Sequence, residues 1–298
     1  SLSQWQGLYT LAGHTDAVNG LFFSQDGHYL ASASIDDTAR LWDLTSGQPV
    51  LTIDAHAGDV SAALISGDVA TGRHLITASR DGSTRIWSLP GGKLQHEIFI
   101  PGIADGIRSL SLHAAGEWIG LRAGNQIWLY DAATGQPVAA SPYGVEGDQP
   151  VAMRSLAFTA DGNQILAGGD DTLPHIWDIA SGAHAALSPP EGIAGHQSAV
   201  LNFQQTRDQR FFVAVSTDRV ALWERAPDTG SLAWRALLDS SGGVRFTGQA
   251  LFSPDSRFLV AATASGSLRI WSLADLTAPP VQVNEYTTAV SGIWFSPD

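Results

Sequence analysis

An aromatic residue recurs along this chain of 298 residues at nearly constant intervals. Each time, a Trp or Tyr closes a short apolar run and is usually followed by an acidic residue or Ser, and successive members lie 43 to 48 residues apart. A period in this range indicates a repeat architecture, in which each repeat forms one small unit that stacks on the next. The six positions are Trp42, Trp87, Tyr130, Trp177, Trp223 and Trp271.

The first repeat shows its internal pattern most clearly. Four short apolar runs, at 21–24, 29–34, 38–43 and 50–53, are separated by turn sequences that contain Asp-Gly, Asp-Asp and Ser-Gly pairs. Short apolar runs punctuated in this way predict four antiparallel strands connected as a meander. A single sheet of this size cannot bury both of its faces, so the repeats are expected to pack on one another.

The order of landmarks in this repeat resembles the WD40 repeat. They are a Gly13-His14 dipeptide, a turn at 23–27, a Leu-Ala-Ser-x-Ser-x-Asp run at 30–36 and a terminal Trp42-Asp43. The resemblance implies an all-β WD40 β-propeller that forms one domain over residues 1–298. The repeats are expected at about 11–53, 54–98, 99–144, 145–187, 188–237 and 238–283, with a partial seventh at 284–298.

The later repeats depart from the pattern in places. The third, fourth and sixth lack the His of the Gly-His dipeptide, and Pro174 falls within the third strand of the fourth repeat. Residues 7–11 resemble an outer strand and 290–295 an inner strand of one further blade. We therefore expect a seven-bladed ring whose seventh blade is incomplete, in a chain that is a piece of a larger protein. A six-bladed ring with spare end strands is the alternative.

Charge and composition exclude several classes of protein. The net charge is −13, whereas nucleic acids and anionic membranes attract clustered Lys and Arg. There are no cysteines, and no apolar run approaches 18 residues, so we expect no disulfide, no membrane span and no signal peptide, and a cytoplasmic location. Lys93 is the only lysine, a bias that we interpret as a sign of a bacterial coding sequence.

The His, Ser, Asp and Trp of the best repeats could be mistaken for catalytic triads. The resemblance implies instead a hydrogen-bonded tetrad inside each blade, running from a turn Asp to His, from His to a strand hydroxyl, and from that hydroxyl to the Trp indole. A structural role is favoured because a catalytic set would not recur in blade after blade. The predicted tetrads are His14, Ser34, Asp36 and Trp42; His56, Ser79, Asp81 and Trp87; and His196, Ser216, Asp218 and Trp223.

Other motifs that carry chemistry are missing from the sequence. It contains no Gly-rich phosphate loop, no G-x-S-x-G elbow, and no second His four residues after His96-Glu97. Asp170-Asp171 stands where the first repeat has a tight turn, so a metal site there is only a minor alternative. We expect no cofactor and no metal.

Partners of WD40 proteins usually dock on the loops that enter the innermost strands. By alignment of the repeats, the candidate partner-binding residues are Asp16, Asp59, Asp105, Arg108, Arg154, Ser198, Arg245 and Phe246. The arginines and Phe246 are favoured within this group because Arg and aromatic side chains supply most binding hot spots.

These observations predict a non-enzymatic scaffold that binds a protein or peptide partner through the loop rim. The expected context is a sensor or docking module of a bacterial multidomain protein, an inference by analogy of fold. The alternative hypothesis is a propeller enzyme or small-ligand binder with a site at the central channel.

Overall fold

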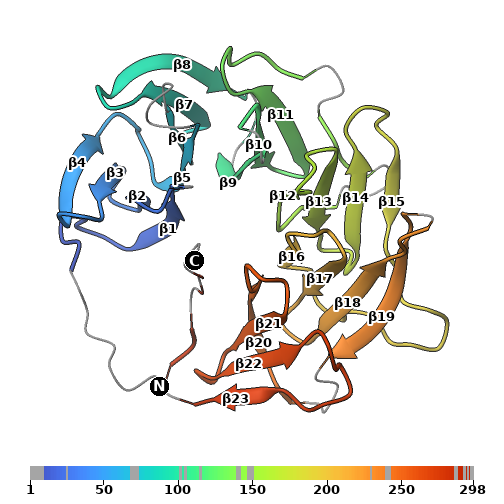
Figure 1. Cartoon of the computed structure of the whole chain (residues 1–298). Helices are drawn as coiled ribbons and strands as arrows, with labels where there is room; N and C mark the ends of the chain where they lie inside the picture. Colours follow the sequence, from blue (N-terminus) through green and yellow to red (C-terminus); the bar gives the residue numbers. More distant parts are fainter. Residues whose placement is uncertain are drawn as a thin grey trace. The chain divides into compact units, whose positions relative to one another are not determined.

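The computed structural model describes residues 10–24, 26–67, 74–100, 103, 106–113, 116–138, 142–145, 151–228, 230–238, 243–284, 288–290, 293 and 295. Every regular element within these ranges is a β-strand, which confirms the all-β prediction. The strands form six antiparallel sheets (Figure 1), each made of strands that are consecutive in the sequence. The chain divides into two compact units, one made of residues 1–110 and 130–136 and the other of residues 111–129 and 137–298.

The first unit contains two four-stranded sheets. Sheet one consists of β1 (Val18–Phe23), β2 (Tyr29–Ser34), β3 (Ala39–Asp43) and β4 (Gln48–Ile53). Sheet two consists of β5 (Val60–Ser66), β6 (His74–Ser79), β7 (Ser83–Ser88) and β8 (Lys93–Phe99). The division between the units falls within sheet three, which has the three strands β9 (Ile107–Leu112), β10 (Trp118–Ala123) and β11 (Gln126–Asp131).

The second unit contains three four-stranded sheets. Sheet four consists of β12 (Ala157–Phe158), β13 (Gln164–Gly168), β14 (Pro174–Asp178) and β15 (His184–Ala186). Sheet five consists of β16 (Asn202–Gln205), β17 (Phe211–Val215), β18 (Val220–Arg225) and β19 (Leu232–Leu238). Sheet six consists of β20 (Phe246–Phe252), β21 (Phe258–Thr263), β22 (Leu268–Ser272) and β23 (Val281–Val283).

The turns repeat the same chemistry from sheet to sheet. After the first strand, a hydroxyl donates to an Asp carboxylate two residues later, as Ser24 does to Asp26 at 2.6 Å, and this contact recurs at Thr159, Thr206 and Ser253. After the third strand, the acidic residue that follows the aromatic accepts backbone N–H groups of the next turn; the Asp43 carboxylate lies 2.7 Å from the Thr45 nitrogen. Short polar side chains stabilise turns in this way, so the Asp of the Trp-Asp pairs is a turn residue.

The strand register is also conserved within this chain. In all five four-stranded sheets the recurring Trp pairs with the second residue of the second strand. Trp42 lies opposite Leu30 in sheet one, and Trp177 lies opposite Ile165 in sheet four. The equal register places each indole on the same face of its sheet, because side chains alternate between the two faces along a strand.

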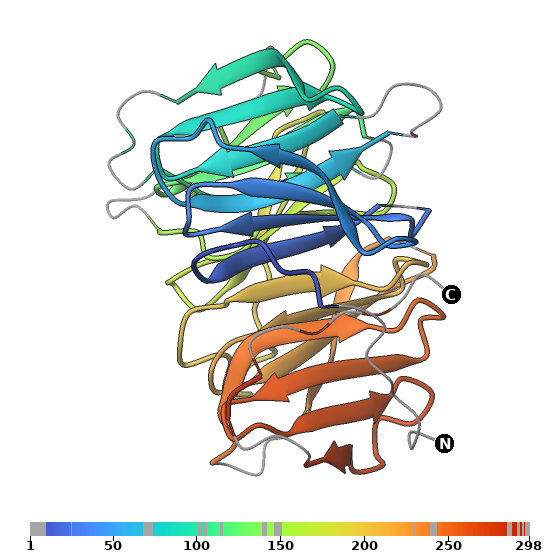
Figure 2. The ribbon, with the colours of Figure 1, turned by 90° about the vertical axis from the view of Figure 1, so that its left-hand side faces the viewer.

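Neighbouring sheets bury their apolar faces against one another. In the first unit, Ala31 and Leu41 of sheet one pack with Leu75 and Trp87 of sheet two, and Figure 2 shows these two sheets lying side by side. Complete burial of one Leu or Ile side chain contributes about 1.5–3 kcal/mol. Each sheet is thus held by its neighbour, as the repeat pattern predicts.

In the second unit, alternate residues along the strands of sheet four belong to two different cores, one on each face of the sheet. Ile165 and Trp177 share a core with residues of sheet three, whereas Leu166 and Ile176 share one with residues of sheet five. Val213 and Leu222 of sheet five pack in turn with Trp271 of sheet six.

Three expectations about the chain's irregular parts have different outcomes. Pro174 is the first residue of β14, so its predicted place in the third strand is confirmed, and at this end position its missing N–H removes no ladder bond from the strand interior. In the third repeat, Tyr143 forms an isolated antiparallel bridge with Ile127 in place of a regular fourth strand. Residues 1–9 and most of 285–298 lie outside the described residues, and the seventh blade stays a prediction, as do the repeat and domain boundaries.

Candidate functional site

The tetrad of sheet one is a continuous chain of buried hydrogen bonds. His14 Nδ1 lies 2.9 Å from the Asp36 carboxylate, and His14 Nε2 lies 2.7 Å from Ser32 Oγ. The Trp42 indole N–H donates to the same Ser32 oxygen at 2.8 Å. A buried imidazole and a buried indole thereby satisfy their polar atoms, which would otherwise destabilise the fold.

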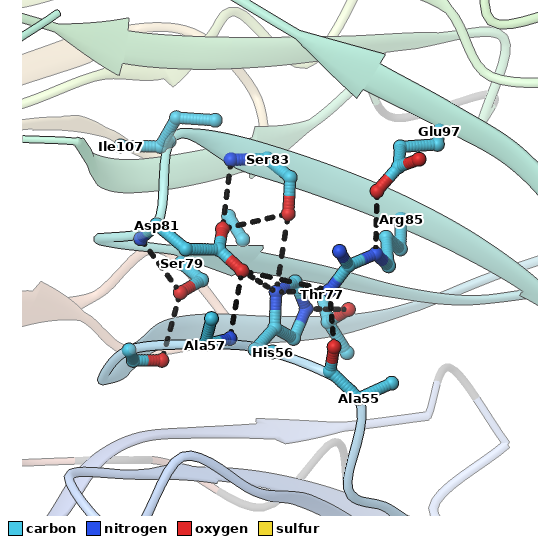
Figure 3. Close-up of polar contacts among 12 residues, drawn as sticks. Ala55, His56, Ala57, Thr77, Ser79, Asp81, Ser83, Arg85, Glu97 and Ile107 are labelled. Carbon is cyan, nitrogen blue, oxygen red and sulfur yellow. Dashed lines mark hydrogen bonds and ion pairs between the residues drawn. The ribbon is translucent and has the colours of Figure 1, made fainter.

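Sheet two repeats this arrangement with Thr in place of Ser (Figure 3). His56 Nδ1 lies 3.1 Å from the Asp81 carboxylate, and His56 Nε2 lies 2.7 Å from Thr77 Oγ1. The Trp87 indole donates to Thr77 Oγ1 at 3.0 Å. Because that oxygen accepts the indole N–H, its own hydrogen can be donated to Nε2, which leaves Nδ1 as the donor to Asp81.

The tetrad hydroxyls predicted from the sequence were therefore wrong by two positions. Ser34 donates to the carbonyl oxygens of Asp16 and Ala17 and accepts the N–H of Asp36, so it stabilises the entry loop and the tight turn. Ser79 does the same in sheet two through Gly58 and Asp81. Positions two apart lie on the same face of a strand, and only the register decides which of them reaches the indole.

An arginine of the third strand joins the second tetrad, a role that the sequence reading missed. Arg85 Nη1 lies 3.5 Å from the Asp81 carboxylate, with which it forms an ion pair, and donates to the Ala55 carbonyl at 2.8 Å, while its Nε donates to Glu97 at 2.8 Å (Figure 3). Arg40 occupies the equivalent register in sheet one and lies over the Trp42 ring at 5.9 Å. The signal available in the sequence was an Arg two residues before each of these tryptophans.

The turn carboxylates are strongly biased toward their charged form. Burial raises the pKa of Asp81, but hydrogen bonds from Ser83, Ala57 and His56 outweigh it and hold the pKa well below the usual range. Burial also raises the pKa of Asp36, but hydrogen bonds from Thr38, Thr15 and His14 outweigh it, so that pKa is likewise depressed. Several donors to a carboxylate stabilise its ionised form.

The third predicted tetrad is incomplete. His196 Nδ1 lies 2.7 Å from Ser216 Oγ, and Ser216 donates to Asp218 at 2.7 Å. The strand position that holds Ser32 in sheet one is occupied by Ala214, so no hydroxyl links His196 to Trp223. His196 Nε2 is buried without a partner, and burial lowers the pKa of His196 to about 4.

In sheets four and six, whose entry loops have no such His, other side chains form the hydrogen bonds at the tight turn. In sheet four, His175 comes from the third strand, and its Nε2 lies 3.0 Å from the turn residue Asp171. In sheet six, Thr263 Oγ1 lies 2.7 Å from Ser267 Oγ and 3.0 Å from Ser265 Oγ. Each of the five four-stranded sheets thus has a polar cluster at the tight turn between its second and third strands, and the side chains that form it differ from sheet to sheet.

This geometry decides what the tetrads can do chemically. An Asp–His–Ser order is that of a hydrolase triad, but Ser32 is 3% exposed and Thr77 is fully buried. Both hydroxyls also accept an indole N–H. A nucleophile must reach a substrate atom, which these buried hydroxyls cannot do. Their role is therefore to stabilise the sheets through hydrogen bonds.

The predicted binding residues lie in the loops that enter the first strand of each sheet or at the start of that strand. Asp16, Arg108 and Arg245 are exposed, and Asp59 pairs with Arg80 at 3.1 Å. Arg154 holds Asp170 through two contacts of 2.5 Å, and Ser198 donates to Asp218 at 2.5 Å. Asp105 lies outside the described residues.

One of these predictions is corrected by the packing. Phe246 is only 2% exposed and belongs to the core between sheets five and six, where its ring lies 6.5 Å from that of Trp271. It opens β20 with its side chain on the buried face, so it cannot serve as a surface contact. Among the described residues, no group of His, Asp and Glu is arranged to hold a metal ion, and no helix is long and apolar enough to cross a membrane.

The fold and the repeated tetrads define an all-β repeat protein of the propeller class. Four segments, residues 5–43, 47–88, 145–178 and 240–272, match the WD40 family, described as WD domain, G-beta repeat. The chain belongs to the WD40 repeat family, and the predicted WD40 β-propeller fold is confirmed. The crystal structure of the Myceliophteria thermophila Cps50 (Swd1) beta-propeller domain shares this fold with a TM-score of 0.73 and 18% identity, covering 94% of this chain and 90% of that one.

The curated relatives are eukaryotic proteins. Transducin beta-like protein 3 of Bos taurus is 26% identical over 286 residues, which cover 92% of this chain and 34% of the relative. COMPASS component SWD3 of Saccharomyces cerevisiae is 36% identical over 207 residues, 67% of this chain and 51% of the relative. The chain thus spans between a third and about half of these relatives. Their origin gives no support to the bacterial source inferred from the lysine-poor composition.

Proposed function

We propose that this chain is a non-enzymatic scaffold that binds a protein or peptide partner through the loops entering the first strands of its sheets. The observation that carries the proposal is the burial of the tetrad hydroxyls, Ser32 and Thr77, which removes the most reactive-looking side chains from solvent. COMPASS component SWD3, a relative of this chain, bears a name that describes a part of a larger assembly. Membership of such an assembly fits a scaffold role.

The exposed side chains of the entry loops differ in charge between the two units. In the first unit Asp16 and Arg108 are exposed, and Asp59 is half-buried. In the second unit the exposed side chains include Arg154 and Arg245. Because Asp170 already neutralises Arg154, Arg245 is the residue of the second unit that we expect to contribute most to a partner with an acidic surface.

Arg245 and Arg257 allow a matched experiment. Arg245 precedes β20 and Arg257 follows it, so the two exposed arginines lie at opposite ends of one strand. Affinity capture with quantitative mass spectrometry would compare the wild type with Arg245→Glu and with Arg257→Glu, which carry the same change in charge. We expect a partner whose recovery falls at least tenfold with Arg245→Glu and not with Arg257→Glu. Equal recovery of every captured protein with both variants would contradict the proposed surface.

A further inference from the structure

Sheet four contains a hydrogen-bonded chain from a tight turn to the molecular surface. Asp171 lies in the turn before β14 and contacts His175 Nε2 through both carboxylate oxygens, at 3.1 and 3.0 Å. His175 Nδ1 lies 3.0 Å from His184 Nε2 on β15. The middle member, His175, is 1% exposed, whereas His184 is exposed. Asp171 and His175 form the polar cluster at the tight turn of sheet four, in the place that a tetrad takes in sheets one and two. His184 has no counterpart in those tetrads.

The positions of the hydrogens in the series Asp171–His175–His184 follow from the Asp171 carboxylate. A carboxylate can only accept, so His175 Nε2 carries a hydrogen and donates it to Asp171. A neutral His175 then accepts at Nδ1, and the donor to it is His184 Nε2. A further proton on His184 must therefore attach to Nδ1, where it converts an acceptor into a donor.

His184 borders a cavity of about 510 Å³ within the second unit. Its ring stacks on Trp177 with 4.7 Å between centroids and an interplanar angle of 21°, and Trp177 lies directly opposite it across the strand pair. The cavity lies between the face of sheet four that carries Trp177 and the segment 142–145, together with Asn125 of the β10–β11 turn and Gln126, the first residue of β11. A volume of this size suits a small ligand or one or two peptide side chains.

The lining determines which ligand the cavity fits. Its polar side chains are Asn125, Gln126, Tyr143 and His184, and no Lys, Arg, Asp or Glu is among the described residues that line it. Two primary amides and one imidazole can donate hydrogen bonds and supply at most one positive charge. A carboxylate, with one negative charge, matches that set, whereas a phosphate carries nearly two and calls for arginine.

We propose that this cavity binds a carboxylate group, and that proton uptake by His184 is coupled to binding. The proton on His184 Nδ1 gives the bound carboxylate a charge-assisted donor, and Asp171 compensates the charge through His175. Two other titratable groups are close. Burial and the charge of Asp178 raise the pKa of Tyr143, which therefore stays neutral, and Asp178 itself is engaged by Ser181 at the end of β14. His184 is thus the histidine of the cavity wall, and its Nδ1 is the atom to which the proposal assigns the proton.

An NMR titration of the whole chain can test this proposal. The probes are acetate and an N-acetylated triglycine with a free carboxylate, and the controls are acetamide and the amidated peptide. The observed signals are the amides of Gly144 and Gly182 and the indole of Trp177. The variant His184→Gln keeps a polar side chain that does not titrate, and His28→Gln changes an exposed histidine of the first unit.

We expect at least one carboxylate probe to bind, with affinity rising up to tenfold for each pH unit between 7.8 and 5.8, as one linked proton requires. His184→Gln should lose this pH dependence and His28→Gln should keep it. Tighter binding of acetate assigns the site to small acids, and tighter binding of the peptide assigns it to chain termini or acidic side chains. Absence of binding, equal binding of the amide controls, or an unchanged pH dependence in His184→Gln would overturn the proposal.

Discussion

Replacement of Thr77 by Val tests whether the tetrad hydroxyl has been placed correctly. Val has nearly the shape of Thr but offers no hydrogen bond. Thr77 is fully buried, and its oxygen lies 2.7 Å from His56 Nε2 and 3.0 Å from Trp87 Nε1. The substitution leaves both partner atoms buried and unsatisfied, and each such group costs about 1–3 kcal/mol. With two such groups, we therefore expect Thr77→Val to lower the free energy of unfolding of the first unit by about 2–6 kcal/mol.

The size of the effect can be measured by urea unfolding followed by tryptophan fluorescence. With a slope of about 2 kcal/mol per molar urea, the midpoint should fall by roughly 1–3 M. Hydrogen exchange of the Trp87 indole N–H, followed by NMR, would show the loss of its acceptor directly. Thr77→Ser is the matched control, because it keeps the hydroxyl and removes only a methyl group.

The companion variant Ser79→Ala separates the two candidate hydroxyls. Ser79 donates to the Gly58 carbonyl at 2.8 Å and accepts the Asp81 N–H at 3.0 Å, at the edge of the entry loop. Removal of the Ser79 hydroxyl should lower the free energy of unfolding by about 1 kcal/mol, since the backbone groups that it contacts can form hydrogen bonds with water instead. The reasoning would be refuted if Ser79→Ala cost as much as Thr77→Val, or if Thr77→Ser were as damaging as Thr77→Val.

Two further predictions concern His196 and Gly162. Burial lowers the pKa of His196 to about 4, against about 6.5 in an unfolded chain. As the pH falls, the unfolded state therefore binds the extra proton before the folded state does. The free energy of unfolding should fall by about 3 kcal/mol in total as the pH drops from 6.5 to 4. Urea unfolding at several pH values should show this loss in the wild type and a smaller one in His196→Gln. Gly162 has φ +72° and an added Cβ would collide with the His113 ring, whereas Gly182 has φ +71° and open space around it. Gly182→Ala should thus cost about 1–2 kcal/mol and Gly162→Ala clearly more in thermal unfolding, and equal losses would show that backbone conformation alone is responsible.

Much of the fold could be predicted from the sequence because its signals are local. The Trp-Asp pairs mark the third strand and the turn after it, and Asp43 accepts hydrogen bonds from that turn. Asp-Gly pairs mark the turn after the first strand, as at Asp26 and Gly27. Chemistry of this kind depends on neighbours within a few residues, so its meaning does not depend on the rest of the chain.

The candidate site was harder to predict because it depends on register and on contacts between strands. Ser32 and Ser34 are equivalent in any pattern with a period of two, and only the pairing of Trp42 with Leu30 brings Ser32 to the indole. The pairing of His184 with Trp177 has the same origin, since nothing nearby in the sequence marks His184 as a partner of His175.

The sequence by itself determined the repeat, the strands, the turns and the family, since the aromatic period and the turn residues act over a few positions. The tertiary structure alone decided that Phe246 is buried under Trp271, that Arg85 joins the tetrad of His56 through Asp81, and that His184 borders a cavity. These facts depend on which side chains meet across strands and between sheets. These contacts are determined by packing and by strand register, which no local stretch of residues specifies.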